Sequence, residues 1–196
     1  MNKHSEDIKA IRTMMEKSSK FLSLSGLSGV FAGLTAIAGA SVAHFFILTD
    51  ELATDPRLLL LADGLGMLLL SVGLCVLLSL MKARRMRLRP SGSMTLAILY
   101  NLGLPLAVGG AFALAALVRG DIQGLTAITL AFYGIALVAV SKYTYRELNY
   151  LGLTDAALGV TALLVPCLGE LLWVAGFGLC HILYGGAMYL KYDRKQ

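Results

Sequence analysis

Long apolar runs separated by short polar connections dominate the chain. The first run, 21–48, has 28 residues and contains no Lys, Arg, Asp or Glu. At the helical rise it is about 42 Å long, enough to cross a bilayer core with some tilt. Barrel strands would need only about ten alternating residues, so runs of this length predict membrane-spanning helices. The expected spans are 21–48, 58–81, 94–118, 122–140, 151–168 and 169–190.

The pattern predicts an all-α fold, a polytopic bundle of six transmembrane helices. The division between the last two spans rests on Pro166 and Gly169, which interrupt a stretch too long for one span. The connections are too short to hold a soluble domain. The expected organisation is therefore a transmembrane domain over 21–190, preceded by a cytoplasmic amphipathic helix over 1–20 and followed by a cytoplasmic tail over 191–196.

The N-terminal segment differs from the spans in being polar and amphipathic. Ser5 can cap a helix, and the apolar side chains of Ile8, Ile11, Met14 and Met15 recur at helical spacing. Such a segment is typical of a helix that runs along the membrane surface into the first span. A second interpretation is that it senses lipid or binds a partner protein.

Composition supports the membrane class. The chain is 57% hydrophobic and only 15% charged, whereas a soluble domain carries about a quarter charged residues. The three cysteines, Cys75, Cys167 and Cys180, lie in or beside apolar runs and form no CxxC motif, so they are expected to be small packing residues.

Basic residues predict the orientation. Fifteen of the 17 lie in alternate connections, on the side of both termini if there are six spans. The positive-inside rule then places both termini in the cytoplasm. One of these connections is strongly basic and is expected to contact lipid headgroups rather than nucleic acid. Its arginines are Arg84, Arg85, Arg87 and Arg89.

The first span carries a stripe of small residues. With about 100° per residue, Gly26, Gly33, Ala40 and His44 fall within about 40° of one line, and Gly29 joins them as a helix-packing candidate. Small residues mark contacts between transmembrane helices. This stripe is therefore expected to be a packing seam, with His44 facing the bundle.

Ionisable groups inside a membrane are costly and are functional candidates by default. Three of them, His44, Asp63 and Glu170, are expected to share the outer leaflet, whereas His181 lies near the midplane and Asp155 close to the cytoplasmic side. Together with the amide in the Pro-interrupted third span, they suggest a polar path or ligand site. The candidates for this path are His44, Asp63, Asn101, Glu170 and His181.

Other chemistries are less well supported. His44, Asp63 and Glu170 are weak candidates for a metal site, because no HxxxH or HExxH spacing accompanies them. The two histidines of the spans lie at different depths, which argues against a bis-histidine haem. No serine or cysteine has a base clearly within reach. We therefore expect no cofactor and no catalytic residue.

The stretch IRTMMEKSSKFLSLSGLSG, residues Ile11–Gly29, resembles a family of small bacterial multi-pass membrane proteins that is itself uncharacterised. The resemblance implies a bacterial inner-membrane location. It brings no activity, ligand or site residue with it.

Three functions remain open on the sequence. The first is a small inner-membrane permease or channel-like protein that moves protons, ions or a small solute. The second is a non-catalytic sensor, scaffold or complex subunit that acts through the N-terminal helix and the basic loop. An intramembrane metal-dependent enzyme ranks last. The expected partners are the lipid bilayer and either a second copy of the chain or a membrane or cytoplasmic protein, and no nucleic acid.

Overall fold

The computed structural model describes residues 7–8, 25–49, 56–85 and 92–194. Within these ranges the chain is helical apart from short turns and contains no strand. Five of the helices are long and apolar enough to cross a membrane. The prediction of an all-α fold is therefore confirmed, and the five long apolar helices are consistent with a multi-pass membrane protein. The expected helix over 1–20, apart from residues 7–8, and the residues Arg87 and Arg89 lie outside the described residues.

The helices follow one another with short connections. Helix α2 (Gly26–Val42) continues into the π-helical segment η1 (Ala43–Leu48). The next four are α3 (Pro56–Arg85), α4 (Gly92–Arg119), α5 (Ile122–Ser141) and α6 (Arg146–Leu164). The remainder, which we call the C-terminal helix, runs from Pro166 to Asp193. It comprises η2 (Pro166–Leu168), α7 (Gly169–Trp173), η3 (Val174–Cys180), α8 (His181–Met188) and η4 (Tyr189–Asp193).

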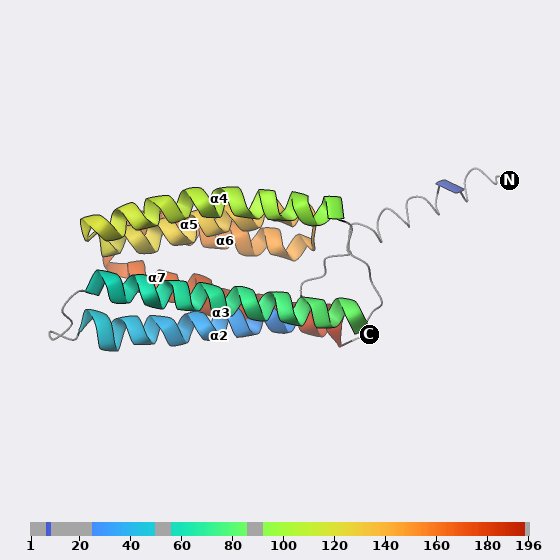
Figure 1. The fold of residues 1–196 in the computed structure, drawn as a ribbon, viewed down its shortest axis with the longest axis horizontal. Helices are drawn as coiled ribbons and strands as arrows, with labels where there is room; N and C mark the ends of the chain where they lie inside the picture. Colours follow the sequence, from blue (N-terminus) through green and yellow to red (C-terminus); the bar gives the residue numbers. More distant parts are fainter. Residues whose placement is uncertain (1–6, 9–24, 50–55, 86–91, 195–196) are drawn as a thin grey trace.

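The helices lie side by side in two groups of three (Figure 1). One group contains α4, α5 and α6, and the other contains α2, α3 and the C-terminal helix. The C-terminal helix also contacts α5 and α6, so it joins the two groups. Its interior face therefore meets side chains from both groups. The candidate site lies on this face.

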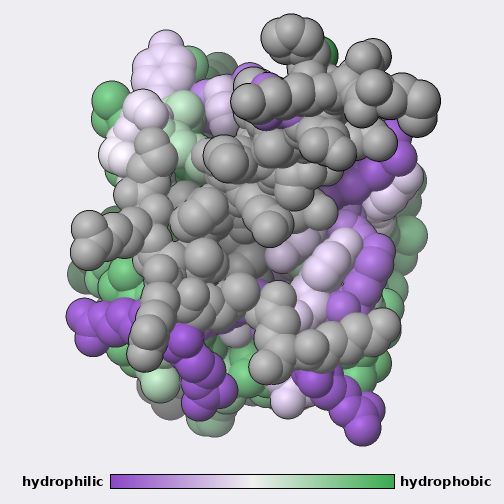
Figure 2. All heavy atoms as spheres, turned by 90° about the vertical axis from the view of Figure 1, so that its right-hand side faces the viewer, coloured by the Kyte–Doolittle hydropathy of each residue, from purple (hydrophilic) through white to green (hydrophobic). Residues whose placement is uncertain are grey.

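We call the two ends of the bundle the terminal end, where α2 begins and η4 ends, and the far end, where η1 ends and α7 begins. Seen from the terminal end, hydrophilic residues gather on this face, whereas hydrophobic residues colour the flanks (Figure 2). Arg84 and Arg85 lie in the last turn of α3 at this end and are exposed. Apolar flanks with polar ends are typical of a bundle that sits across a bilayer.

Glycines let α2 approach the C-terminal helix closely. A Cβ on Gly33 would lie 2.5 Å from the carbonyl oxygen of Gly178, and a Cβ on Gly29 would lie 3.0 Å from the Cα of Gly185. A Cβ on Gly26 would also meet the backbone at Gly185. The small stripe of the first span thus lies backbone to backbone against glycines of the last.

A second glycine contact joins α5 to α6. A Cβ on Gly134 would lie 2.6 Å from the carbonyl oxygen of Gly152, and a Cβ on Gly152 would lie 2.7 Å from the carbonyl oxygen of Gly134. Two turns further along α6, Gly159 faces the backbone of Ala131 in the same way. Small residues bring transmembrane helices close enough for van der Waals packing to hold them, so these contacts set the level at which α5 and α6 side chains meet.

Helix α6 differs from the expected fifth span. It begins at Arg146 rather than Leu151 and ends at Leu164, because Val165 leaves the helical conformation and Pro166 starts the next helix. Its 19 residues give a length of about 28 Å, close to the bilayer core. It carries Arg146, Glu147 and Asp155 and is not among the five strongly apolar helices.

At the terminal end, Asp193 of the last helix joins three segments. Its carboxylate accepts hydrogen bonds from the backbone N–H of Gly26, at 2.8 Å, and from the hydroxyl of Ser25, at 3.4 Å. Its other oxygen pairs with Lys82 of α3, and both side chains of this pair are nearly buried, at 11% and 12% exposure. Asp193 therefore supplies the cap that α2 lacks locally and neutralises a lysine.

Candidate functional site: a buried polar cluster at mid-bundle

His181 is the first residue of α8, and its side chain is buried. Its Nδ1 lies 2.9 Å from the carbonyl oxygen of Gly176, and its Nε2 lies 2.9 Å from the hydroxyl of Tyr133. A carbonyl can only accept, so Nδ1 carries the proton. In the neutral imidazole Nε2 is then the acceptor, and Tyr133 donates its hydroxyl proton to it.

The backbone before His181 is wound as a π-helix, the segment η3 (Val174–Cys180). π-Helical segments are rare and are frequently found at functional sites. Here the carbonyl oxygen of Gly176 accepts a hydrogen bond from the Nδ1–H of His181. This bond holds the imidazole in one tautomer. His44 also lies in a π-helical segment, η1.

Asp155 of α6 is fully buried, and neither carboxylate oxygen has a hydrogen-bond partner among the described residues. A Cβ on Gly176 would lie 2.9 Å from Asp155 Oδ1 and 2.6 Å from the side chain of Leu130. The absence of a side chain at Gly176 therefore makes room for the carboxylate. Gly176 faces Asp155 and its carbonyl bonds His181, so the acid and the imidazole both lie next to this residue.

These groups lie near the middle of their helices. Asp155 is the tenth residue of the 19 in α6, about 14 Å from either end. Tyr133 reaches the same level because Gly134, its neighbour in α5, packs against the backbone of Ala156, the neighbour of Asp155. The arrangement places an acid, an imidazole and a phenol together at the depth where water is scarcest.

Aromatic rings cover this cluster toward the far end. The ring of Phe177 lies 4.8 Å from that of Tyr133, 4.7 Å from that of Trp173 and 6.0 Å from that of His181. Trp173 Nε1 donates to the hydroxyl of Thr129 at 3.1 Å. The cluster is therefore separated from the far end by packed rings.

Toward the terminal end the interior holds the buried apolar cluster of Leu137, Val140, Leu148 and Leu151, and it also contains three shielded hydroxyls. Tyr184, one turn after His181, and Ser79 of α3 both carry hydroxyls that are shielded from solvent and have no hydrogen-bond partner among the described residues. Thr144, in the turn after α5, carries a third such hydroxyl. Tyr184 packs against this apolar cluster, so the polar atoms toward the terminal end are separate hydroxyls beside apolar side chains.

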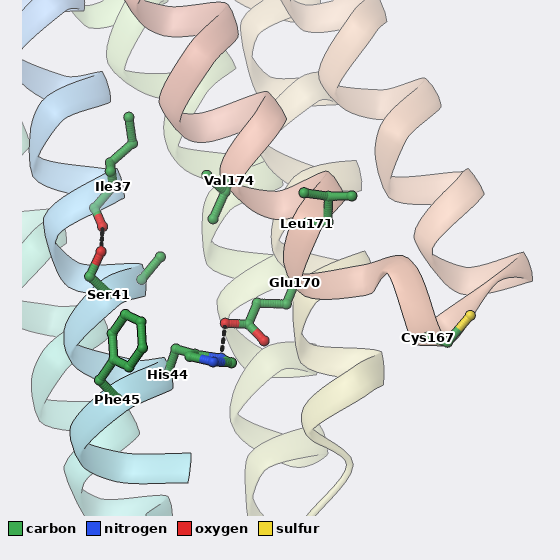
Figure 3. Close-up of a pocket in the computed structure, with 9 residues that line it drawn as sticks. Ile37, Ser41, His44, Phe45, Cys167, Glu170, Leu171 and Val174 are labelled. Atoms are coloured by element: carbon green, nitrogen blue, oxygen red, sulfur yellow. Dashed lines mark hydrogen bonds and ion pairs between the residues drawn. The ribbon is translucent and has the colours of Figure 1, made fainter. Parts of the chain in front are cut away.

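At the far end, His44 and Glu170 lie together. The Nδ1 of His44 is 2.8 Å from Glu170 Oε1, and both side chains are about half exposed. The pair sits in an open groove of about 370 Å³ between η1 and α7, with Ile37, Ala40 and Val174 along its wall (Figure 3). Cys167 lines the opposite side of the groove from His44 (Figure 3). The groove gives this ion pair access from the far end.

The structure puts the two remaining path candidates, Asp63 and Asn101, at different levels of the bundle. Asp63 lies one turn from Met67, the residue that meets Gly39 of α2, so it shares the level of His44. Asn101 donates to the carbonyl of Ala97 at 2.8 Å and to the hydroxyl of Tyr143 at 3.4 Å, in the turn after α5. Its partners thus lie toward the terminal end.

Among the described residues, no three histidine, cysteine, aspartate or glutamate side chains come together as a metal ion would require. His44 Nδ1 and Glu170 Oε1 approach each other as a pair, at 2.8 Å, with no third ligand group beside them among the described residues. The chemistry that the buried cluster does offer is proton exchange, because a carboxyl, an imidazole and a phenol can each gain or lose a proton.

Sequence reasoning placed Asp155 near the cytoplasmic side because the span was taken to begin at Leu151. Since α6 begins at Arg146, Asp155 lies at mid-helix. A signal for its orientation was present: Gly152 and Gly159 flank it at spacings of three and four residues, which puts Asp155 on the small-residue face of α6. No motif or spacing in the sequence singles out Tyr133 as a partner of His181.

The bond between Tyr133 and His181 can be tested by stability. We expect Tyr133→Phe to lower the free energy of unfolding by about 1–3 kcal/mol, because it leaves the buried Nε2 of His181 without a donor. Tyr192→Phe is the control, since Glu147 keeps its pairing with Lys191 when that hydroxyl is lost. Thermal unfolding in detergent compares the two, and equal midpoints would contradict the assigned bond.

Comparison with known proteins brings no relative: the chain matches no protein family model, no curated protein and no solved structure.

Proposed function

We propose that this chain is a small permease or channel-like membrane protein that moves protons, ions or a small polar solute through the interior between its two helix groups. The observation that carries the proposal is the buried polar cluster around His181 and Tyr133 at mid-bundle. Burying such groups in the membrane is costly, and they usually mark a pathway or a relay.

The surroundings of the cluster support gated movement. The shielded hydroxyls of Tyr184, Ser79 and Thr144 lie on the terminal-end side of the cluster, whereas the rings of Phe177 and Trp173 pack over it toward the far end. The His44–Glu170 pair lies beyond these rings in an open groove. A path between the groove and the cluster therefore needs the aromatic layer to move, which is typical of gates and carriers.

We propose that the protein lies in a bacterial inner membrane, with α6 as its sixth span. The concentration of basic residues near the terminal end favours a cytoplasmic position for that end under the positive-inside rule. The exposed Arg84 and Arg85 would then meet the anionic headgroups of the inner leaflet.

The test is ion flux in proteoliposomes with a trapped pH-sensitive dye for protons and a potassium-sensitive dye for cations. The wild-type protein should dissipate an imposed gradient faster than empty vesicles, and His181→Phe should return the rate to that of empty vesicles. Gly186→Ala, on the same helix in open space, is the control and should keep wild-type flux. Wild-type protein that moves neither ion, or a fully active His181→Phe, would contradict the proposal.

A further inference from the structure

We propose that Asp155 is a proton-binding residue, a carboxyl group that takes up and releases a proton inside the bundle. The inference deepens the proposed function by naming the proton as the species that the interior handles, and its role in flux rests on that proposal. The binding step itself is simple: a proton adds to one carboxylate oxygen, forming an O–H bond, and leaves from that oxygen again.

Burial without a partner carries this inference. Asp155 is fully shielded, and both of its oxygens lack a hydrogen bond to any described residue. An ionised carboxylate in such a place loses its hydration with no compensation from a cation or a donor. Protonation removes the charge without requiring any rearrangement of the helices.

The neighbours favour a proton over a metal cation. Sodium, calcium and magnesium need several oxygen ligands. The groups that a side chain at Gly176 would meet beside Asp155 are instead the aliphatic side chains of Leu130 and Leu158. A proton needs only one oxygen of the acid itself.

The titratable groups on the elements packed against α6 allow a proton to travel. Tyr133 of α5 and Cys180 of η3 lie within electrostatic range of Asp155. His181 is bonded to Tyr133 and to Gly176, and Tyr184 lies one turn nearer the terminal end. No lysine or arginine is paired with Asp155 among the described residues, so no fixed cation holds the carboxylate ionised. The imidazole and the phenols can pass a proton to and from the acid when the cluster opens.

Infrared spectroscopy of the protein in lipid tests this without any gradient or transport. A protonated carboxyl in apolar surroundings has a carbonyl stretch distinct from that of a carboxylate or of a hydrated acid. We expect the wild-type protein to show such a band at low pH and to lose it as the pH rises. Asp155→Asn should lack the band at every pH, whereas the control Asp63→Asn should keep it.

Each possible result of this experiment supports or contradicts the assignment of Asp155 as the proton-binding residue. A band that is absent at all pH values, or unchanged by pH and by Asp155→Asn, would overturn the assignment. Suppression of the band by sodium at constant pH would show a cation site in its place. Asp155→Glu covers the case in which Asp155→Asn fails to fold, since it should keep a band at a shifted frequency. Because no flux is measured, a protein that binds the proton at Asp155 but moves nothing would contradict only the proposed function.

Discussion

Gly185→Ala is expected to lower the free energy of unfolding by about 2 kcal/mol or more, because overpacking a tight contact forces the backbone to shift. A Cβ at Gly185 would lie 2.6 Å from the carbonyl oxygen of Gly26 and would also meet the backbone at Val30. The nearest atoms of α2 are all backbone atoms, so no flexible side chain can move aside. The contact between α2 and the C-terminal helix should therefore loosen.

The neighbouring glycine provides the matched control. A Cβ at Gly186 would meet nothing within 4 Å, so Gly186→Ala should leave stability unchanged or raise it by about 0.5–1 kcal/mol through the better helix propensity of alanine. Unfolding of both variants in a denaturing detergent series measures the difference. Equal stability of the two variants would mean that α2 and the C-terminal helix do not meet at Gly185.

Asp193→Ala is expected to destabilise the terminal end by about 3–5 kcal/mol, the usual effect of removing one partner from a buried ion pair. The change leaves Lys82, which is 12% exposed, without its carboxylate. It also removes the acceptor for the backbone N–H of Gly26, so α2 loses its cap.

Glu147→Ala is the control for this effect, because Glu147 is paired with a lysine at the same end but in a more exposed place. Its partner Lys191 is 60% exposed, so solvent screens this pair and its loss should cost far less stability than the loss of the buried pair. Thermal unfolding in the same detergent should separate the two variants clearly. A loss at Asp193 no greater than that at Glu147 would contradict the buried pair.

The helices themselves could be predicted from the sequence, whereas their pairing could not. Crossing a bilayer demands long apolar runs, and those runs are visible in the chain. The stripe at Gly26 and Gly33 predicted a packing face, but no local pattern names the partner of that face. The partner proved to be Gly178 and Gly185, more than 140 residues further along the chain.

The candidate site could be predicted only in part. Depth alone suggested that His44 and Glu170 share one layer, and the structure places them 2.8 Å apart. The same reasoning misplaced Asp155, because the polar residues Arg146 and Glu147 were read as a loop although they form the first turn of α6. The pairing of His181 with Tyr133 depends on how α5 packs against the C-terminal helix, which the sequence of neither helix reveals.

The most direct test of a proton-handling interior is proton flux in vesicles that contain either the wild-type protein or Asp155→Asn. Asparagine has the size of the protonated acid but cannot release a proton, so it should keep the fold. We predict that the wild-type protein collapses an imposed pH gradient and that Asp155→Asn, with wild-type thermal stability, leaves the gradient as empty vesicles do. A folded Asp155→Asn variant that collapses the gradient at the wild-type rate would contradict the account.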